Sequence, residues 1–353
     1  MKKLFFLLFV LLCSCNKAFE NDLKKDNLLG NVKSSQEIHY DGIEKFGEVT
    51  LGSLIWKSKS IYDVKGNKIE EEFYNINDPS LGKNKYVFDQ KGNKIEEQYY
   101  DSDGNLLCKK INVYDDKKKL LEMQVYKSDG SYDGKYKCVY DDNGNMIVQQ
   151  WHHIKGSLDG KLKYLYDDNG NKIEEQWYNL NGNLTQKNKY VYDIRDNKLE
   201  ENYYNSDGSL IQNSKYIYDG KGNMIEEQSN GSDGSGFKRK YIFDSKGNNI
   251  EEQGYGRDGS FMNKFKYVYD DKGKKIEQQE YDSNEILLRK FVDVYDEKGN
   301  QIESQFFGSN EKLVLNTKYK YTYDSRGNWI IKVSRNIDGS RCFYTERKIE
   351  YFD

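Results

Sequence analysis

Residues that could perform catalysis or bind a metal are few and scattered in this sequence. Histidine occurs three times, at His39, His152 and His153. A zinc or transition-metal site needs three or four converging ligands, and no third ligand can be placed beside the adjacent pair. In neighbouring copies of a repeat described below, the position of His152 is filled by Tyr, so ordinary variation explains it. No metal or cofactor is expected.

Glutamate recurs at a fixed position along the chain, for example at Glu70, Glu96, Glu174 and Glu200. A glycosidase needs two carboxylates in different environments across a cleft, whereas a column of identical Glu paired with Lys is typical of a solvated face. The sequence also contains no recognisable Ser/His/Asp or Cys/His set and no phosphate-binding glycine loop that opens a helix. We therefore expect no catalytic residue and no enzymatic activity.

Asp101-Ser102-Asp103-Gly104-Asn105 is similar to the start of a calcium-binding loop, but the twelfth position is Asn112 where such loops have Glu. A plain turn is the favoured interpretation, and calcium at some turns stays open. After Cys13 and Cys15, the remaining thiols are Cys108, Cys138 and Cys342, at positions that do not predict a disulfide between Cys108 and Cys138.

Aromatic residues form the one recurrent row that could contact a ligand. They include Tyr99, Trp151, Trp177 and Tyr203, each ten residues after a recurrent Asp. Such a row can stack on sugars or meet a partner protein. It can equally line a core, and this second hypothesis is favoured because the row shares a face with a column of Ile.

The elements that would position this row follow from a repeat of 26 residues. A Tyr/Phe-Asp pair occurs with its Asp at 63, 89, 115, 141, 167, 193, 219, 244, 270, 296 and 324. Ile or Leu follows six residues later in all eleven copies, and Gly follows three residues later in nine. A fixed period over this length indicates a repeat architecture.

Each copy is predicted to form two antiparallel strands and two turns. Asp followed by Gly in the fourth position is the composition of a type I turn whose Gly is left-handed. The flanking residues alternate with period two, as strands do. If Asp89 faces Asn93 across the tip, then Val87 faces Ile95, and Tyr86 and Phe88 share the other face with Glu96 and Tyr100.

The predicted fold is therefore all-β, a set of tandem antiparallel hairpins forming a spiralling or rolled elongated meander sheet. About 22 strands spaced by roughly 4.8 Å would make a ribbon on the order of 100 Å long. Strand twist of about 20° per strand would prevent this ribbon from lying flat.

The motif of an aromatic residue, Asp and then Gly resembles the YD repeat, also called the Rhs-type repeat. The resemblance covers about residues 60 to 353 and implies a sheet of spiralling hairpins. Here the motif continues as Gly-Asn-Lys-Ile in residues 66–69, where the family usually has Gly-Arg-Leu, and neither a protease-like cap nor a toxin domain is found. Similar short YD-repeat lipoproteins are largely without an assigned function.

The first residues indicate secretion and lipid attachment. Lys2-Lys3 precede an apolar run from Leu4 to Leu12, which is too short to span a bilayer. The following Cys13-Ser14-Cys15 resembles a lipobox, which makes residues 1–14 a signal peptide and Cys15 the lipidated mature N-terminus. An ordinary secreted protein cleaved nearby is the alternative. Residues 15–35 are expected to form the lipidated Cys and a flexible tether, and residues 36–353 the repeat domain.

These features together favour a non-catalytic, membrane-anchored binding or scaffold module of the bacterial envelope that contacts a protein or a glycan. The outer membrane or cell surface is the favoured location. Loss of Lys2 and Lys3 changes the formal charge from −3 to −5, so nucleic acid is not an expected partner. The alternative is a purely structural or self-associating surface protein.

Overall fold

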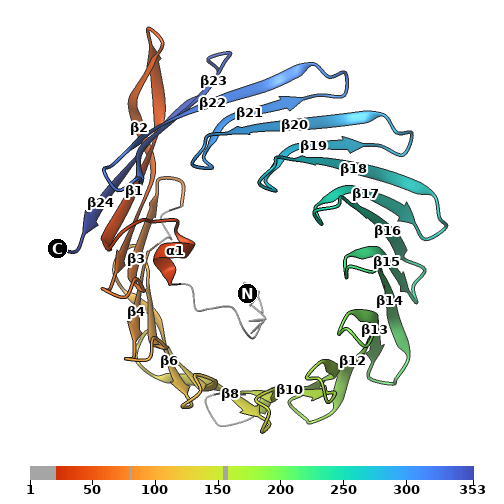
Figure 1. The fold of residues 1–353 in the computed structure, drawn as a ribbon. Coiled ribbons are helices and arrows are strands. Elements are labelled where there is room, and N and C mark those ends of the chain that lie inside the picture. Colours follow the sequence, from red (N-terminus) through yellow and green to blue (C-terminus); the bar gives the residue numbers. More distant parts are fainter. Residues whose placement is uncertain (1–20, 79–81, 154–157) are drawn as a thin grey trace.

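The structure, a computed structural model, describes residues 21–78, 82–153 and 158–353, and apart from one short helix it is all-β (Figure 1). Helix α1 spans Asp22–Lys25. The 24 strands of the described residues are β1 Val32–Lys45, β2 Glu48–Tyr62, β3 Lys68–Asn75, β4 Lys83–Phe88, β5 Lys94–Tyr100, β6 Leu106–Tyr114, β7 Leu120–Lys127, β8 Tyr132–Tyr140, β9 Met146–His153, β10 Leu158–Tyr166, β11 Lys172–Asn179, β12 Leu184–Tyr192, β13 Lys198–Asn205, β14 Leu210–Tyr218, β15 Met224–Gly231, β16 Gly236–Phe243, β17 Asn249–Gly256, β18 Phe261–Tyr269, β19 Lys275–Tyr281, β20 Leu287–Tyr295, β21 Gln301–Phe307, β22 Leu313–Tyr323, β23 Trp329–Asn336 and β24 Cys342–Tyr351. Consecutive strands pair antiparallel in one sheet.

The turn after each Tyr/Phe-Asp pair is held by the Asp itself. In the turn of Asp89, the Gly92 amide donates to the Asp89 carbonyl (3.1 Å), and the Asn93 amide donates to Asp89 Oδ1 (2.8 Å). Gly92 has φ of +83°, the left-handed conformation that glycine adopts without strain. Lys118 and Asp196, which replace this Gly, also have positive φ, of 65° and 62°. The predicted type I turn is confirmed.

Every such turn is followed by a β-bulge, and the bulge changes the predicted register. Phe88 lies opposite Lys94, but Val87 lies opposite Glu96, so Ile95 is the extra residue. This is the pattern of a type I turn closed by a left-handed residue. The predicted pairing of Val87 with Ile95 is wrong. As a consequence Tyr86 shares a face with Glu97 and Tyr99, and not with Glu96 and Tyr100.

The tyrosine of the motif joins each repeat to the one before it. Its hydroxyl donates to the backbone carbonyl twenty residues earlier, in the strand that follows the preceding turn; Tyr192 donates to the Lys172 carbonyl at 3.0 Å. The same bond is made by Tyr114, Tyr140, Tyr166, Tyr218 and Tyr269. Because these six repeats are fixed to their neighbours in the same way, a similar rotation accumulates along this part of the sheet.

The sheet closes on itself, because β24 pairs antiparallel with β1. The seam reproduces a repeat hairpin split between the two ends of the described chain. Tyr351 lies opposite Val32 before a register shift, Gly30 has φ of +84°, and the Phe352 amide donates to the Asn31 carbonyl at 2.9 Å. The predicted all-β fold of tandem antiparallel hairpins is confirmed, but the expectation of a spiralling or rolled elongated sheet is wrong. The 24 strands of the described residues form a closed β-barrel with both edges paired.

Residues 21–31 pack across this seam, although the sequence predicted a tether up to residue 35. Leu23 and Leu28 form the small buried cluster of the described residues with Val32 and Tyr62. The Leu29 amide and carbonyl both bond the Asn328 side chain, at 2.8 and 2.9 Å. A chain segment that spans the first and last turns in this way stabilises the closure, since it buries apolar side chains and satisfies backbone groups on both sides of it.

Closure predicts that whole repeats, but not half repeats, can be removed. Deleting residues 168–193 removes β11 and β12 and leaves an even number of strands, so β24 and β1 still meet antiparallel. Deleting residues 168–180 removes only β11, after which the last strand would run parallel to the first. We expect the first deletion to keep a cooperative β-rich fold by circular dichroism and urea melting, and the second to lose it. Equal stability of the two variants would contradict the assignment of 26 residues, or two strands, as the structural repeat.

Candidate functional site

Helix α1 identifies the face of the sheet that looks into the ring, since it lies inside the ring (Figure 1). Tyr62 Oη donates to the carboxylate of Asp26, directly after α1, at 2.5 Å. Lys68 Nζ lies 3.1 Å from the same carboxylate and 3.4 Å from that of Glu71. Tyr62, Lys68 and Glu71 therefore belong to the inner face, and by strand alternation so do their equivalents in every repeat.

The inner face carries a repeated lattice of Tyr, Glu and Lys. Glu201 accepts from Lys198 Nζ at 2.6 Å, from Tyr203 Oη at 2.5 Å and from Tyr216 Oη at 3.2 Å. Burial by itself would raise the pKa of Glu201, but these hydrogen bonds and the Lys198 charge outweigh it and hold the pKa below its usual value. The inner wall is thus polar but internally satisfied.

Tyr99 and Tyr203 of the predicted row stand on this wall, on β5 and β13. Tyr99 Oη donates to Glu97 Oε2 at 2.8 Å, and Lys110 Nζ lies 4.8 Å from the centre of the Tyr99 ring. Burial is the main cause that raises the pKa of both phenols, so each hydroxyl remains a protonated donor. Each ring is consequently fixed at its polar end.

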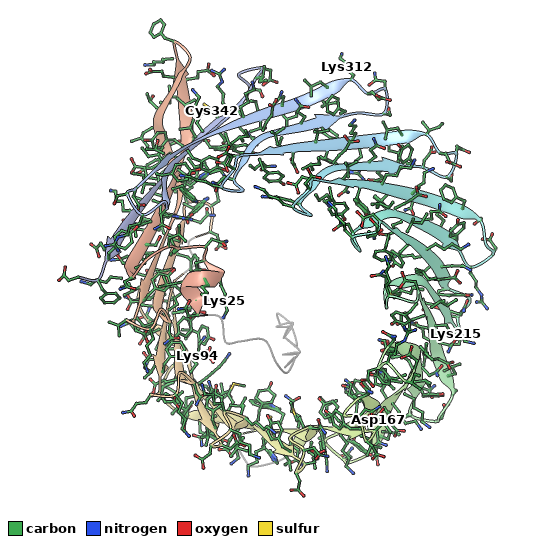
Figure 2. All side chains as sticks on the ribbon, in the orientation of Figure 1. Lys25, Lys94, Asp167, Lys215, Lys312 and Cys342 are labelled. Atoms are coloured by element: carbon green, nitrogen blue, oxygen red, sulfur yellow. The ribbon has the colours of Figure 1, made fainter. Side chains whose placement is uncertain are left out.

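Trp151 and Trp177 lie on the same wall, on β9 and β11. The Trp151 ring centroid lies 4.0 Å from that of Tyr136, and Trp177 lies opposite Leu162 on the intervening strand β10. Neither Trp is buried, and both are partly exposed. Figure 2, which draws the described side chains, shows that they leave the centre of the ring open. Among the described residues, the row therefore lies on the wall that faces the centre of the ring, and its role in binding stays a prediction.

The outer face carries the Glu column, with Lys beside it. Lys109 Nζ lies 3.1 Å from Glu96, Gln98 donates to Glu96 at 2.6 Å, and Tyr100 donates to Gln98 at 2.5 Å. The Tyr, Gln and Glu chain recurs on β7, β11, β17 and β19. The interpretation of this column as a charge-paired, solvated face is confirmed.

A column of aliphatic residues two positions before the motif Asp interrupts the outer charges. Nine of them are each 41–51% exposed: Val87, Val113, Val139, Leu165, Val191, Ile217, Ile242, Val268 and Val294. Eight of the nine lie opposite an outer-face Glu, such as Glu96 opposite Val87 and Glu200 opposite Val191, and Val139 lies opposite Val148. The apolar residues are thus separated by charged neighbours.

The remaining sequence candidates show ordinary structural contacts. Asp101 Oδ1 accepts from the amides of Asp103 and Asn105, at 3.0 and 2.8 Å, as in a turn. Cys108 and Cys138 lie on β6 and β8, with β7 between them, so no disulfide joins them. Residues 21–78, 82–153 and 158–353 contain no cluster of three or more His, Cys, Asp or Glu that could hold a metal. Cys15 lies outside the described residues.

Sequence reasoning missed one row of side chains at the seam. Tyr321, Lys332, Thr345, His39 and Trp56 lie directly opposite one another across β22, β23, β24, β1 and β2. Lys332 stands eight residues after its Asp, where Glu71, Glu97 and Glu201 stand in other repeats. That departure from the column was readable from the sequence. The pairing of β24 with β1, which brings His39 to Lys332, was not.

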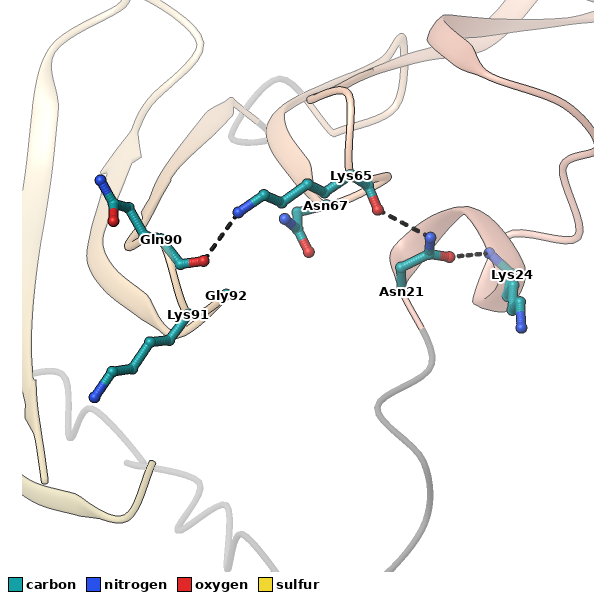
Figure 3. Close-up of a pocket in the computed structure, with 7 residues that line it drawn as sticks. All are labelled: Asn21, Lys24, Lys65, Asn67, Gln90, Lys91 and Gly92. Carbon is teal, nitrogen blue, oxygen red and sulfur yellow. Dashed lines mark hydrogen bonds between the residues drawn. The ribbon is translucent and has the colours of Figure 1, made fainter. Parts of the chain in front are cut away.

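A small open cleft of about 330 Å³ lies between α1 and the first two turns (Figure 3). The Asn21 side chain donates to the Lys65 carbonyl at 3.0 Å, and Lys65 Nζ donates to the Gln90 carbonyl at 2.9 Å. The first bond joins the N-cap of α1 to the first turn, and the second joins the first turn to the second. The polar groups at the cleft therefore hold these elements together.

Helix α1 has four residues, and the described residues contain no helix that is long and apolar enough to cross a bilayer.

Comparisons with known proteins give only a distant structural likeness. No protein-family model matches the sequence, and no curated protein matches it. Among solved structures, the crystal structure of TcdB2-TccC3 aligns with 86% of this chain and 22% of its own, at 10% identity and a TM-score of 0.34. A porin-like protein from Bacteroides uniformis aligns with 90% of this chain and 98% of its own, at 10% identity and a TM-score of 0.25. The chain thus spans about a fifth of the length of the first of these.

Proposed function

We propose that this chain is a lipid-anchored, non-catalytic binding module of the bacterial cell envelope, built from YD-type repeats, which holds a protein segment or a glycan against the inner wall of its ring. The observation that carries the proposal is the row of Tyr99, Trp151, Trp177 and Tyr203, which is partly exposed on a wall facing an open interior. Aromatic rings held in place by neighbours offer contact area at little entropic cost.

The anchor follows from Cys15 and from where the described chain begins. Cys15 lies six positions before Asn21, which bonds the first turn. Six residues span at most about 20 Å, so a lipid on Cys15 would hold the rim that carries the Tyr/Phe-Asp turns close to a membrane. The outer membrane or the cell surface remains the favoured location.

The charged side chains of the outer face support a ring whose outer surface contacts water and not lipid chains. A surface in contact with lipid hydrocarbon chains must be continuously apolar, because charged side chains cost several kcal/mol there. The outer face instead carries Glu and Lys in ion pairs, such as Glu122 with Lys135 at 3.1 Å and Glu226 with Lys238 at 2.7 Å. A covalent lipid would then provide the attachment that the sheet surface does not.

Self-association of a structural surface protein is the second candidate. It is favoured by the exposed aliphatic column on the outer face, which a second copy could cover. Because charged neighbours separate these residues, the column offers no continuous apolar patch, and we rank this function below ligand binding in the interior.

The anchor is tested by replacing Cys15 with Ala. We expect the variant to lack lipid and to leave the membrane fraction, while its circular dichroism stays unchanged, because residue 15 precedes the fold. Cys108→Ala, which alters a thiol in the sheet, is the control and should remain in the membrane fraction. Detergent-phase partitioning of Cys15→Ala equal to that of wild type would contradict lipidation.

The binding wall is tested with Trp151→Ala/Trp177→Ala. Because both rings are partly exposed, we expect the melt to shift by well under the roughly 3 to 5 kcal/mol per site that a packed aromatic would cost. Retention of a partner or glycan from envelope extract should be lost. The matched control is Tyr178→Ala/Tyr204→Ala, which alters the outer face of β11 and β13. Unchanged capture by the Trp variant, or equal loss in both variants, would contradict a binding role for the row.

A further inference from the structure

A second feature of the inner wall lies at the seam, away from the aromatic row. The residues of this seam row are Tyr321, Lys332, Thr345, His39 and Trp56, one from each of five neighbouring strands. They share the inner face because Lys332 occupies the position of the inward-facing Glu71 and Glu201. The seam row therefore belongs to the interior that the proposed function opens to a ligand.

Lys332 is a cation that lacks a carboxylate partner among the described residues. Its Nζ lies 5.1 Å from the ring centre of Tyr319 and 5.8 Å from that of Tyr321, so two aromatic faces hold the side chain. The nearby carboxylate of Glu37 is already bound by Arg347, whose Nε donates to it at 2.9 Å. Burial is the main cause that lowers the pKa of Lys332.

The charged groups beside Lys332 pair with each other and not with it. Arg347 and Glu37 form an ion pair at 2.5 Å. A ligand carboxylate, which is ionised at neutral pH, would pair with the ammonium of Lys332.

Aromatic and hydroxyl groups beside Lys332 also suit an anion. His39 is stacked between Trp56 and Phe343, with ring centres 5.3 and 5.1 Å apart. The three rings thus form one stack across β2, β1 and β24. The buried Thr345 bonds His39 Nδ1 at 2.8 Å and fixes the orientation of the imidazole.

We propose that the seam row is a binding site for a small organic carboxylate, with Lys332 as the group that pairs with the carboxylate and His39 and Trp56 as the adjoining side chains. The proposal rests on the proposed function only in requiring an accessible interior. It does not require that the row of Trp151 and Trp177 bind anything.

The test uses the full-length mature protein and three related probes: galacturonate, its uncharged methyl ester, and galactose. The chain has four Trp, of which Trp56 and Trp329 lie at the seam and Trp151 and Trp177 on the row. In a Trp151→Phe/Trp177→Phe background, fluorescence therefore reports the seam alone. We expect saturable quenching by galacturonate and none by the ester or galactose.

Lys332→Met should lower the affinity for galacturonate by about tenfold or more, and Lys332→Arg should retain most of it. Lys320→Met is the matched control, since Lys320 lies on the adjacent strand β22 with its side chain on the exposed outer face, and it should bind as wild type.

Absence of saturable galacturonate binding, equal binding of the methyl ester, or equal loss in Lys320→Met would overturn the proposal. The comparison with the methyl ester needs no substitution at Lys332, so it decides the matter even if Lys332→Met fails to fold. If galacturonate still binds at the seam in the Trp151→Phe/Trp177→Phe variant, the proposed site is upheld, whether or not the row of Trp151 and Trp177 retains a partner.

Discussion

The Asp at the start of each motif turn is the constraint on which the fold depends. Its backbone and carboxylate together accept from the amides that follow, as Asp193 does from Asp196 at 3.1 Å and from Asn197 at 3.0 Å. This locks a type I turn, a left-handed residue and a bulge into each copy. Bulges bend and twist a sheet, so a turn repeated along the chain becomes curvature repeated along the chain, and curvature of one sign brings the first and last strands together.

The strands, the turns and their period follow from the sequence because they depend on local chemistry. Asp, Gly and Asn at fixed offsets determine a turn whatever the rest of the chain does. The register was predicted one residue out, because a bulge adds a residue that the alternation of Val87 and Ile95 does not reveal. This error exchanged Glu96 for Glu97 as the neighbour of Tyr86, and with it the residues assigned to each face.

Closure could not be predicted in the same way, since it is a sum over all repeats. A small difference in the rotation between neighbouring strands decides whether the sheet forms a spiral or a closed ring, and no single residue determines that rotation. The sequence nevertheless contains the residues of the seam. Tyr351-Phe352 and Gly30-Asn31 correspond to the two halves of one repeat turn, at opposite ends of the fold. The first half was assigned to a tether because residues 16 to about 35 are polar and charged.

The separation of the two faces gives the molecule its chemical character. On the outer face, Glu and Lys side chains form ion pairs with each other. On the inner face, Tyr, Glu and Lys side chains are joined by hydrogen bonds. Against this uniform background, two places on the inner wall differ: the strip that includes Trp151 and Trp177, and the seam, where Lys332 replaces the usual Glu. Recognition in a repeat protein depends on such departures, because the repeat itself presents the same surface many times.

Hydrogen exchange of the seam strands tests the closed ring most directly. If β24 and β1 are paired, the amides of Glu346, Lys348 and Glu350 should exchange as slowly as those in the middle of β12. These amides face β1, because the Phe352 amide donates to the Asn31 carbonyl and every second amide of a strand faces the same neighbour. If the sheet is an open spiral, β1 and β24 are edges, and their outward amides should exchange orders of magnitude faster than those of β12. Slow exchange at the seam is the result that closure predicts, and fast exchange confined to β1 and β24 would contradict it.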